Sequence, residues 1–138
     1  MKVTLRRNTG VHFTATTESG HAIELDGSEP VGGQEKGARP METVLAGLGG
    51  CTAIDVMSTL GKSRQDVADC VIDIDAERAD SIPAVFTRIH MHYTLVGNDL
   101  DPKKVARAVS LSAEKYCSVT RMLEKTAVIT HDFEIQEP

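Results

Sequence analysis

The sequence predicts an α+β domain of 138 residues, in which short strands flank one long central helix. Two observations support this prediction. Residues 40–62 keep apolar or small side chains on nearly every face for about six helical turns. The segments on either side alternate apolar and polar residues, or are rich in β-branched ones, which is typical of strands. We therefore expect a single domain, 1–138, built around a helix that is buried on most sides.

Three short strands are predicted before the helix, at 2–8, 11–17 and 21–25. The tight turns between them favour an antiparallel meander. The next segment, 26–39, holds four glycines, one proline and several charges, which is the composition of a loop. Loops of this length are often functional or mobile. An ordinary surface connection explains the segment equally well.

The central helix is expected to begin at Pro40, because proline is favoured at the first helical position. Its only charged residues are Glu42, Asp55 and Lys62. At about 23 residues the segment is long enough to cross a bilayer. Its glycines dilute the apolar character, however, and carboxylates are costly in lipid. The sequence therefore favours the central helix of a soluble protein.

The second half is predicted to hold a long hairpin, two helices and a last strand. The hairpin pairs 67–78 with 85–96, since both segments alternate. Asp101 is expected to cap the first helix, and Ser118 a shorter second helix. The predicted order is three strands, the long helix, two strands, two helices and a final strand at 127–136.

The composition restricts the compartment and the partners. The formal net charge of −5 and the absence of Lys and Arg clusters argue against nucleic acid and acidic membranes as partners. No apolar segment follows the first residues, so we expect no signal peptide. Three cysteines, an odd number, do not resemble a secreted disulfide framework. We expect a cytoplasmic protein with reduced thiols.

Cys51 lies inside the central helix, and Asp55 follows one turn later on the same face. A cysteine in such a place is more often inert core than a nucleophile. A buried carboxylate needs a partner, so this face should meet a polar site or another subunit. Asp55 should also disfavour a thiolate at Cys51 unless an Arg or Lys offsets the repulsion.

Cys117 directly precedes a predicted helix N-terminus, where unpaired N–H groups and the helix dipole should lower its pKa. On local physics it is the better thiolate, although a half-buried structural cysteine is the commoner case. Cys70, with no basic neighbour, is interpreted as packing. His90 and His92 share one strand face, but no third ligand has a characteristic spacing, so solvated or cross-strand packing is favoured.

Three of these features together suggest a family. Pro40 and Glu42 open the long helix as Pro-x-Glu, and Cys51 follows nine residues after the glutamate. A second cysteine, Cys117, comes much later, in the stretch AEKYCSV. This pattern, with the element order, resembles the OsmC/Ohr family of thiol peroxidases over essentially the whole chain. The stretches CTAIDV and LSAEKYCSV look like a small, uncharacterised bacterial subgroup of OsmC-like proteins.

The resemblance implies an OsmC-like fold of antiparallel sheets with a long buried central helix, in an intertwined homodimer with active sites at the subunit interface. It also implies reduction of hydroperoxides, often organic ones. Cys51 would attack the peroxide and become a sulfenic acid. Cys117 would resolve it as a Cys51–Cys117 disulfide, and a thiol or lipoylated protein would reduce the disulfide. No metal or flavin cofactor is implied.

The family also uses an Arg to hold the thiolate and a Glu to hold the Arg. Its peroxidases typically carry that Glu directly after the Pro, whereas this chain has Met41 there and Glu42 next. One residue rotates a side chain by about 100° around a helix. Arg39 is the nearest candidate arginine, with Arg6 and Arg7 as alternatives. Without a basic partner, Cys51 is expected to be a slow peroxidase.

Two other functions remain open. The chain could be a dimeric small-molecule-binding or redox-sensing protein of the same fold, in which Met41, Met57 and Met122 would suit an adaptable apolar pocket. A purely structural stress protein is the weaker alternative. A thiolate fraction at Cys51 near neutral pH separates a peroxidase from a binding protein, because only the peroxidase needs one.

Overall fold

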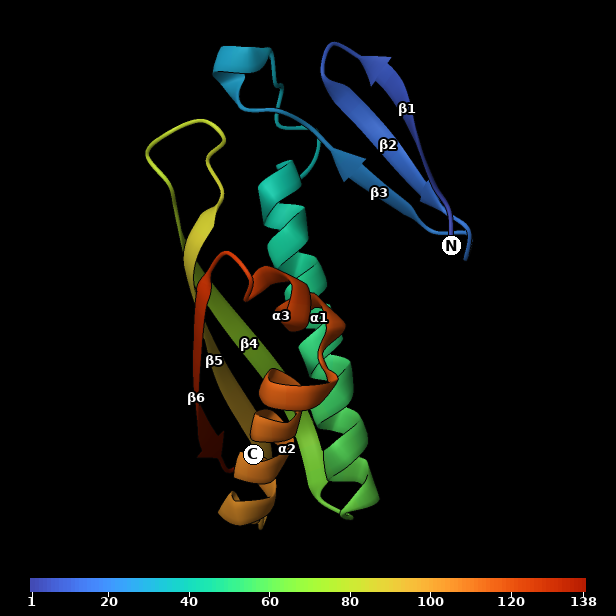
Figure 1. Ribbon diagram of the computed structural model, residues 1–138. Coiled ribbons are helices and arrows are strands. Elements are labelled where there is room, and N and C mark those ends of the chain that lie inside the picture. The colour runs from blue at the N-terminus through green and yellow to red at the C-terminus, as the bar shows by residue number, and fades with distance from the viewer. The chain divides into compact units, whose positions relative to one another are not determined.

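The computed structural model describes all residues from Met1 to Pro138 (Figure 1). The chain forms two compact units, Met1–Ala46 and Gly47–Pro138, which are described separately. One helix, α1 (Pro40–Lys62), begins in the first unit and ends in the second. The single domain 1–138 therefore stays a prediction, while the predicted order of strands and helices is found.

The first unit contains the expected three-stranded meander. Strands β1 (Val3–Thr9), β2 (His12–Thr17) and β3 (Ala22–Leu25) pair in sequence order, and both pairs are antiparallel. Gly10, at a φ of +55°, and Gly20, at +89°, form the two turns, where a side chain would strain the backbone. The meander follows from alternating segments separated by residues that accept a left-handed conformation.

The segment between β3 and α1 is organised by one buried carboxylate. Asp26 accepts hydrogen bonds from the backbone amides of Gly27, Gln34 and Lys36, at 2.8, 3.0 and 3.1 Å. These amides, that of Gln34 first, hold the pKa of Asp26 below its ordinary value despite burial. A short 3₁₀ helix, Glu29–Val31, lies inside the segment. The loop was predicted correctly from its composition, but the composition did not indicate the hydrogen bonds to Asp26 or the 3₁₀ helix.

The second unit is built on a mixed sheet. Strands β4 (Asp66–Arg78) and β5 (Phe86–Asn98) form the predicted antiparallel hairpin. Strand β6 (Val128–Gln136) pairs with β5 in parallel, so the prediction of antiparallel sheets is wrong for this sheet. The reason is the long helical connection between them, which carries the chain back to the end where β5 begins.

That connection contains α2 (Pro102–Leu111), a π turn at Ser112–Tyr116 and α3 (Ser118–Leu123). Asp101 caps α2 as predicted, accepting a hydrogen bond from the amide of Lys103 at 2.9 Å. Figure 1 shows α2 and the second half of α1 on the same side of the β4–β5–β6 sheet. The core of this unit lies between these helices and the sheet, and its fully buried side chains include Leu48, Leu60, Ile89, Met91, Tyr93, Leu95, Val105 and Val109.

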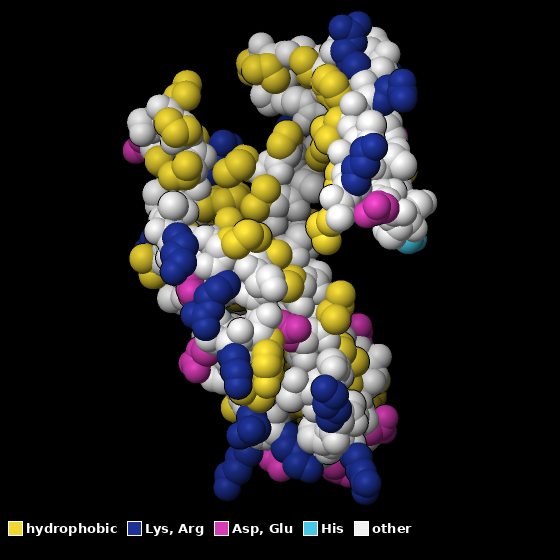
Figure 2. Space-filling model, turned by 45° about the vertical axis from the view of Figure 1, so that its right-hand side comes forward, with side chains coloured by type: hydrophobic (Ala, Val, Ile, Leu, Met, Phe, Trp, Pro, Cys, Tyr) yellow, Lys and Arg dark blue, Asp and Glu magenta, His cyan; other side chains and the backbone are white.

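Within the single chain, helix α1 is buried on one face only, whereas the sequence predicted a helix buried on most sides. Leu48, Val56 and Leu60 are fully buried, whereas Ile54 is 72% exposed and Met57 is also exposed. Figure 2 shows hydrophobic side chains, in yellow, that are uncovered on the side of the molecule it presents. By length and composition the helix is apolar enough to cross a membrane, a property that the core helix of a soluble protein can share.

The solvent face of the second sheet carries a histidine–aspartate cluster. Parallel pairing places His92 opposite Asp132. Asp132 Oδ1 lies 2.7 Å from His92 Nδ1 and 3.0 Å from His90 Nε2. The hydrogen bond with Asp132 raises the pKa of His92, and the same bond lowers the pKa of Asp132. Cross-strand packing of the two histidines, favoured from the sequence, is confirmed.

We expect Asp132→Asn to lower the pKa of His92 toward its ordinary value, as followed by NMR titration of the imidazole. The pair's stabilising contribution should be complete between the ordinary pKa values of 3.8 for Asp and 6.5 for His. It should be lost above this window as His92 deprotonates, and below it as Asp132 is protonated. Glu134→Gln is the control, since that carboxylate lies 4.0 Å from His92. Equal effects of both variants would contradict the assignment.

Candidate functional site

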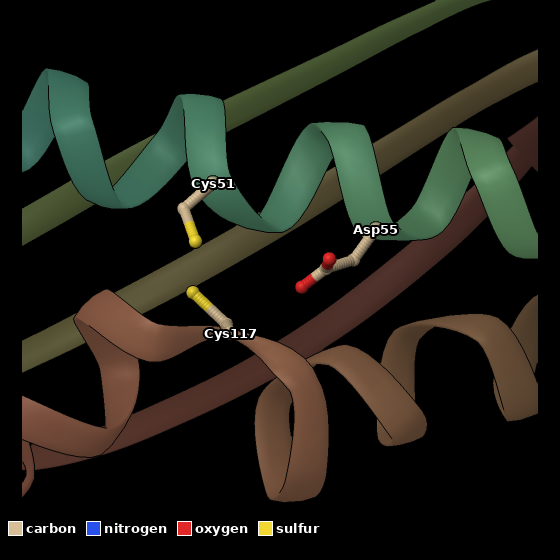
Figure 3. A group of neighbouring side chains, drawn as sticks. All are labelled: Cys51, Asp55 and Cys117. Carbon is tan, nitrogen blue, oxygen red and sulfur yellow. The ribbon is translucent and has the colours of Figure 1, made fainter.

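Three side chains meet in the second unit, two from α1 and one from the N-terminus of α3. The sulfurs of Cys51 and Cys117 and a carboxylate oxygen of Asp55 all lie within 4.8 Å of one another. Figure 3 shows the two sulfurs pointing toward each other, with the carboxylate beside them. All cysteines are free thiols. The structure thus brings together the two cysteines and the aspartate that the sequence singled out.

The helix geometry of α1 accounts for the first two of these residues. Cys51 and Asp55 are four positions apart and share one face of α1. The neighbouring Gly49 lets the helix approach the sheet closely, because a Cβ at this position would lie 3.1 Å from Ile74 Cδ1. Both site residues are half-buried. They therefore lie at the edge of the core rather than inside it.

Cys117 is positioned by the end of the π turn. Its backbone leaves the helical conformation (φ −71°, ψ 106°), and its amide donates to the carbonyl of Ser112 at 2.9 Å. Its sulfur accepts a hydrogen bond from the amide of Thr120 at 3.4 Å. Cys117 is therefore the N-cap of α3, and the prediction that Ser118 caps this helix is wrong by one residue. Sulfur fills the place that a hydroxyl oxygen usually takes.

The pKa of Cys117 is shifted in the direction opposite to the one expected from the sequence, because the side chain is buried. The side chain is only 3% exposed, and burial raises the pKa of the thiol above its ordinary value. The hydrogen bonds from Thr120 act in the opposite direction but are outweighed. The prediction of a lowered pKa is therefore wrong, because it considered the helix terminus without the surrounding core. Burial also raises the pKa of Cys70.

A buried chain of hydroxyl groups supports the carboxylate of Asp55. The hydroxyl of Ser112 donates to Asp55 Oδ2 at 3.0 Å and lies 2.7 Å from the hydroxyl of Thr52, which is 2.6 Å from that of Tyr93. Each hydroxyl has one proton, so donation runs from Tyr93 through Thr52 and Ser112 to the carboxylate. The partner expected for Asp55 is thus found. Sequence reasoning missed this chain, although Thr52 and Ser112 stood as polar residues on apolar helix faces.

We expect Thr52→Val to destabilise the folded protein by about 1–3 kcal/mol, because the buried hydroxyls of Tyr93 and Ser112 would lose a partner. Valine keeps the shape of threonine, so lost packing should add little. Urea unfolding measures the effect. Thr16→Val, at an exposed strand position without a side-chain hydrogen bond, is the matched control and should change stability by less than about 0.5 kcal/mol. Equal stabilities of the two variants would contradict a structural role for the hydroxyl chain.

Arg39 and Glu42 belong to the first unit. Glu42 Oε1 accepts a hydrogen bond from the backbone amide of Arg39 at 2.7 Å, which satisfies a free N–H at the start of α1. The guanidinium of Arg39 forms an ion pair with Glu35, and this bond raises the pKa of Arg39. In this structure Glu42 therefore acts as a helix cap, and Glu35 is the carboxylate that holds the arginine.

A cavity opens beside Asp55. Its volume is about 660 Å³, and its lining includes Asp55, Lys62, Arg107, Leu111 and Tyr116. Two of these side chains are cationic, and one is a carboxylate of the thiol site. The cavity therefore suits small polar or anionic molecules, and it borders the thiol site through Asp55.

Comparison with known proteins identifies the family. A family model described as OsmC-like protein matches residues 33–132. The chain belongs to the OsmC-like protein family. Protein YhfA of Escherichia coli strain K12, an OsmC-like relative, is 49% identical over 126 residues, which cover 91% of each protein. Family membership predicted from Pro40, Glu42, Cys51 and Cys117 is thereby confirmed.

Solved structures share the OsmC-like fold. A hypothetical protein from Aquifex aeolicus VF5 is 31% identical, with a TM-score of 0.87 over 99% of this chain and 96% of that chain. An organic hydroperoxide resistance protein OsmC from Legionella pneumophila is 12% identical, with a TM-score of 0.71 over 97% of each chain. At that identity the second likeness shows the fold alone. The predicted α+β, OsmC-like fold is confirmed.

Proposed function

We propose that this protein is a thiol-dependent peroxidase that reduces hydroperoxides, organic ones among them, through Cys51 and Cys117. The observation that supports this best is the approach of the two sulfurs to within 4.8 Å from elements far apart in sequence. Relatives of the same fold that are named for organic hydroperoxide resistance agree with this chemistry. The two thiols supply the electrons, so the proposed reaction uses no metal or flavin.

Burial suggests which cysteine attacks the peroxide and which one forms the disulfide afterwards. Cys51 is half-buried and reachable, so its thiolate attacks one oxygen of the peroxide. The O–O bond breaks, the leaving oxygen takes a proton and departs as an alcohol, and Cys51 becomes a sulfenic acid. The buried thiol of Cys117 then displaces the hydroxyl group as water. The resulting disulfide is about 2.05 Å long, so the sulfurs must move closer to form it.

A second thiol compound must restore the site. Formation of the disulfide leaves the protein oxidised by two electrons. A dithiol, such as that of a lipoylated protein, can reduce the disulfide to two thiols by exchange. The cavity that Asp55 lines offers space beside the site for the thiol-bearing arm of such a reductant. A cytoplasmic location, where the three thiols rest reduced, suits this cycle.

The exposed face of α1 supports a homodimer. Ile54 and Met57 are exposed, and a Cβ at Gly47 or Gly50 would meet no atom within 4 Å. Each of these glycines lowers the stability of the helix by roughly 1 kcal/mol relative to alanine. Close packing against a neighbour would explain them, and the single chain supplies no such neighbour. A second copy packed on this face would use them. Sedimentation equilibrium should give twice the chain mass, and a monomer at micromolar concentration would refute the dimer.

A single-turnover experiment tests the proposed function. One equivalent of tert-butyl hydroperoxide is added to the reduced protein, and disulfides are mapped by mass spectrometry. We expect a Cys51–Cys117 disulfide, loss of two thiols per chain and one equivalent of tert-butanol. Cys70 should stay reduced and serves as the internal control. Three free thiols and unconsumed peroxide after minutes would refute the peroxidase.

The cavity favours a second candidate, small-molecule binding. Lys62 and Arg107 in its lining suit an anionic ligand better than the apolar ligand considered from the sequence. A protein that used the site only for binding would keep three free thiols and leave the peroxide unconsumed in the single-turnover experiment. Ligand-induced thermal stabilisation, lost in Arg107→Gln, would then support the binding protein.

A further inference from the structure

We propose that Cys51, Asp55 and Cys117 form a binding site for a zinc ion, and that zinc bound there keeps peroxide from the thiol pair. Two thiolates and one carboxylate are ligands that Zn²⁺ commonly takes in proteins. The three ligand atoms already lie within 4.8 Å of one another. Bonds of about 2.3 Å to sulfur and 2.0 Å to oxygen place ligand atoms about 3.5–3.8 Å apart around a tetrahedral zinc. Only small side-chain movements are therefore needed.

The atoms around the ligands suit such a site. Ser112 donates to Asp55 Oδ2, which fixes the carboxylate and leaves Oδ1 free of this hydrogen bond. The amide of Thr120 donates to the sulfur of Cys117, which orients the thiolate. The hydroxyls of Thr52 and Tyr93 extend this support into the core. Outer partners of this kind are what distinguish a metal site from a chance cluster of ligands.

The site has an entry route and an open coordination position. Asp55 lines the cavity of about 660 Å³, so one of the three ligands is open to it, while Lys62 and Arg107 in the same lining repel a cation and should slow its entry. Three protein ligands leave the fourth tetrahedral position for water. Zinc binding displaces the two thiol protons into solvent, while the carboxylate binds as it is.

Zinc and peroxide would compete for the same sulfur atoms. A zinc-bound thiolate has its lone pair engaged, so it is a weaker nucleophile toward the O–O bond. Oxidation of the zinc-bound pair would transfer two electrons from the thiolates to the peroxide, take up two protons, and yield the disulfide, an alcohol, water and free Zn²⁺. This regulatory step rests on the proposed function, whereas the binding site itself does not.

Zn²⁺ binding is measured on the reduced, metal-free full chain by competition with a chromogenic chelator, without peroxide. We expect one Zn²⁺ per chain in the wild type and in Cys70→Ser, which is the matched control. Cys51→Ser and Asp55→Asn should weaken binding at least tenfold, and Ser112→Ala by roughly 10–100-fold, because the carboxylate of Asp55 would lose the hydroxyl that orients it. Circular dichroism verifies that each variant is folded. No zinc bound by the wild type, or equal binding by Cys51→Ser and Cys70→Ser, would overturn the site.

Co²⁺ gives an independent readout on the unmodified protein. Cobalt bound by thiolates has an intense near-ultraviolet charge-transfer band, and we expect it in the wild type and at reduced intensity in Cys117→Ser. Absence of the band in the wild type would overturn thiolate ligation even if a variant failed to fold. For the regulatory step, one equivalent of Zn²⁺ should slow single-turnover peroxide reduction, and chelator should restore it. Zinc binding in a protein without peroxidase activity would refute the proposed function and leave the metal site standing.

Discussion

Cys51→Ser should reduce peroxide consumption to the rate of the uncatalysed reaction. Serine keeps the size of the side chain, but its hydroxyl is not ionised at neutral pH and cannot act as the sulfur nucleophile. Cys117 cannot take its place, because its thiol is 3% exposed and burial raises its pKa. Loss of hydroperoxide from solution, followed with a ferrous-oxidation dye in the presence of dithiothreitol, measures the effect.

The matched control for this variant is Cys70→Ser. Cys70 lies on β4, half-buried, and is not a member of the Cys51–Asp55–Cys117 group. It should keep the full rate, so the comparison removes any general effect of losing a thiol. Turnover by Cys51→Ser at the wild-type rate would show that another group reacts with peroxide.

Cys117→Ser should separate the two halves of the cycle. The first step needs only Cys51, so one equivalent of peroxide should be consumed at close to the wild-type rate. The sulfenic acid then has no neighbouring thiol and should persist long enough for a cyclic diketone such as dimedone to trap it at Cys51. Mass spectrometry identifies the adduct and its position.

Turnover in this variant should fall at least tenfold when a protein dithiol is the reductant, because each sulfenic acid must wait for an external thiol. The wild type under the same conditions should give the disulfide and almost no adduct. Peroxide consumed by Cys117→Ser without any adduct or mixed disulfide at Cys51 would remove Cys117 from the resolving role.

The sequence predicted the order of elements well because local patterns encode it. Alternation defined β4 and β5, and Asp101 with Pro102 marked the start of α2. The pairing of β6 with β5 was not predictable in the same way. The alternation of Ile129 and Phe133 fits a parallel and an antiparallel neighbour equally. Only the path of the intervening helices decides between them.

The site was predicted in part, for a similar reason. Cys51 and Cys117 were found through the family pattern, and Asp55 through its spacing from Cys51. The hydroxyl chain through Thr52, Ser112 and Tyr93 joins three elements, so no local window contains it. The pKa of Cys117 was predicted to be lowered because the sequence indicates a helix terminus at this residue. Burial, which raises the pKa, depends on the packing of the whole unit and could not be predicted locally.

The difference in burial between the two cysteines decides which sulfur of the proposed Cys51–Cys117 disulfide an external thiol would attack. An incoming thiol can reach the sulfur of half-buried Cys51 but not that of Cys117, so a mixed disulfide should form only on Cys51. Cys117 is then always the leaving group, and a thiol of raised pKa leaves slowly. The oxidised protein should therefore be long-lived, and the supply of reductant, more than that of peroxide, would set how often each molecule works.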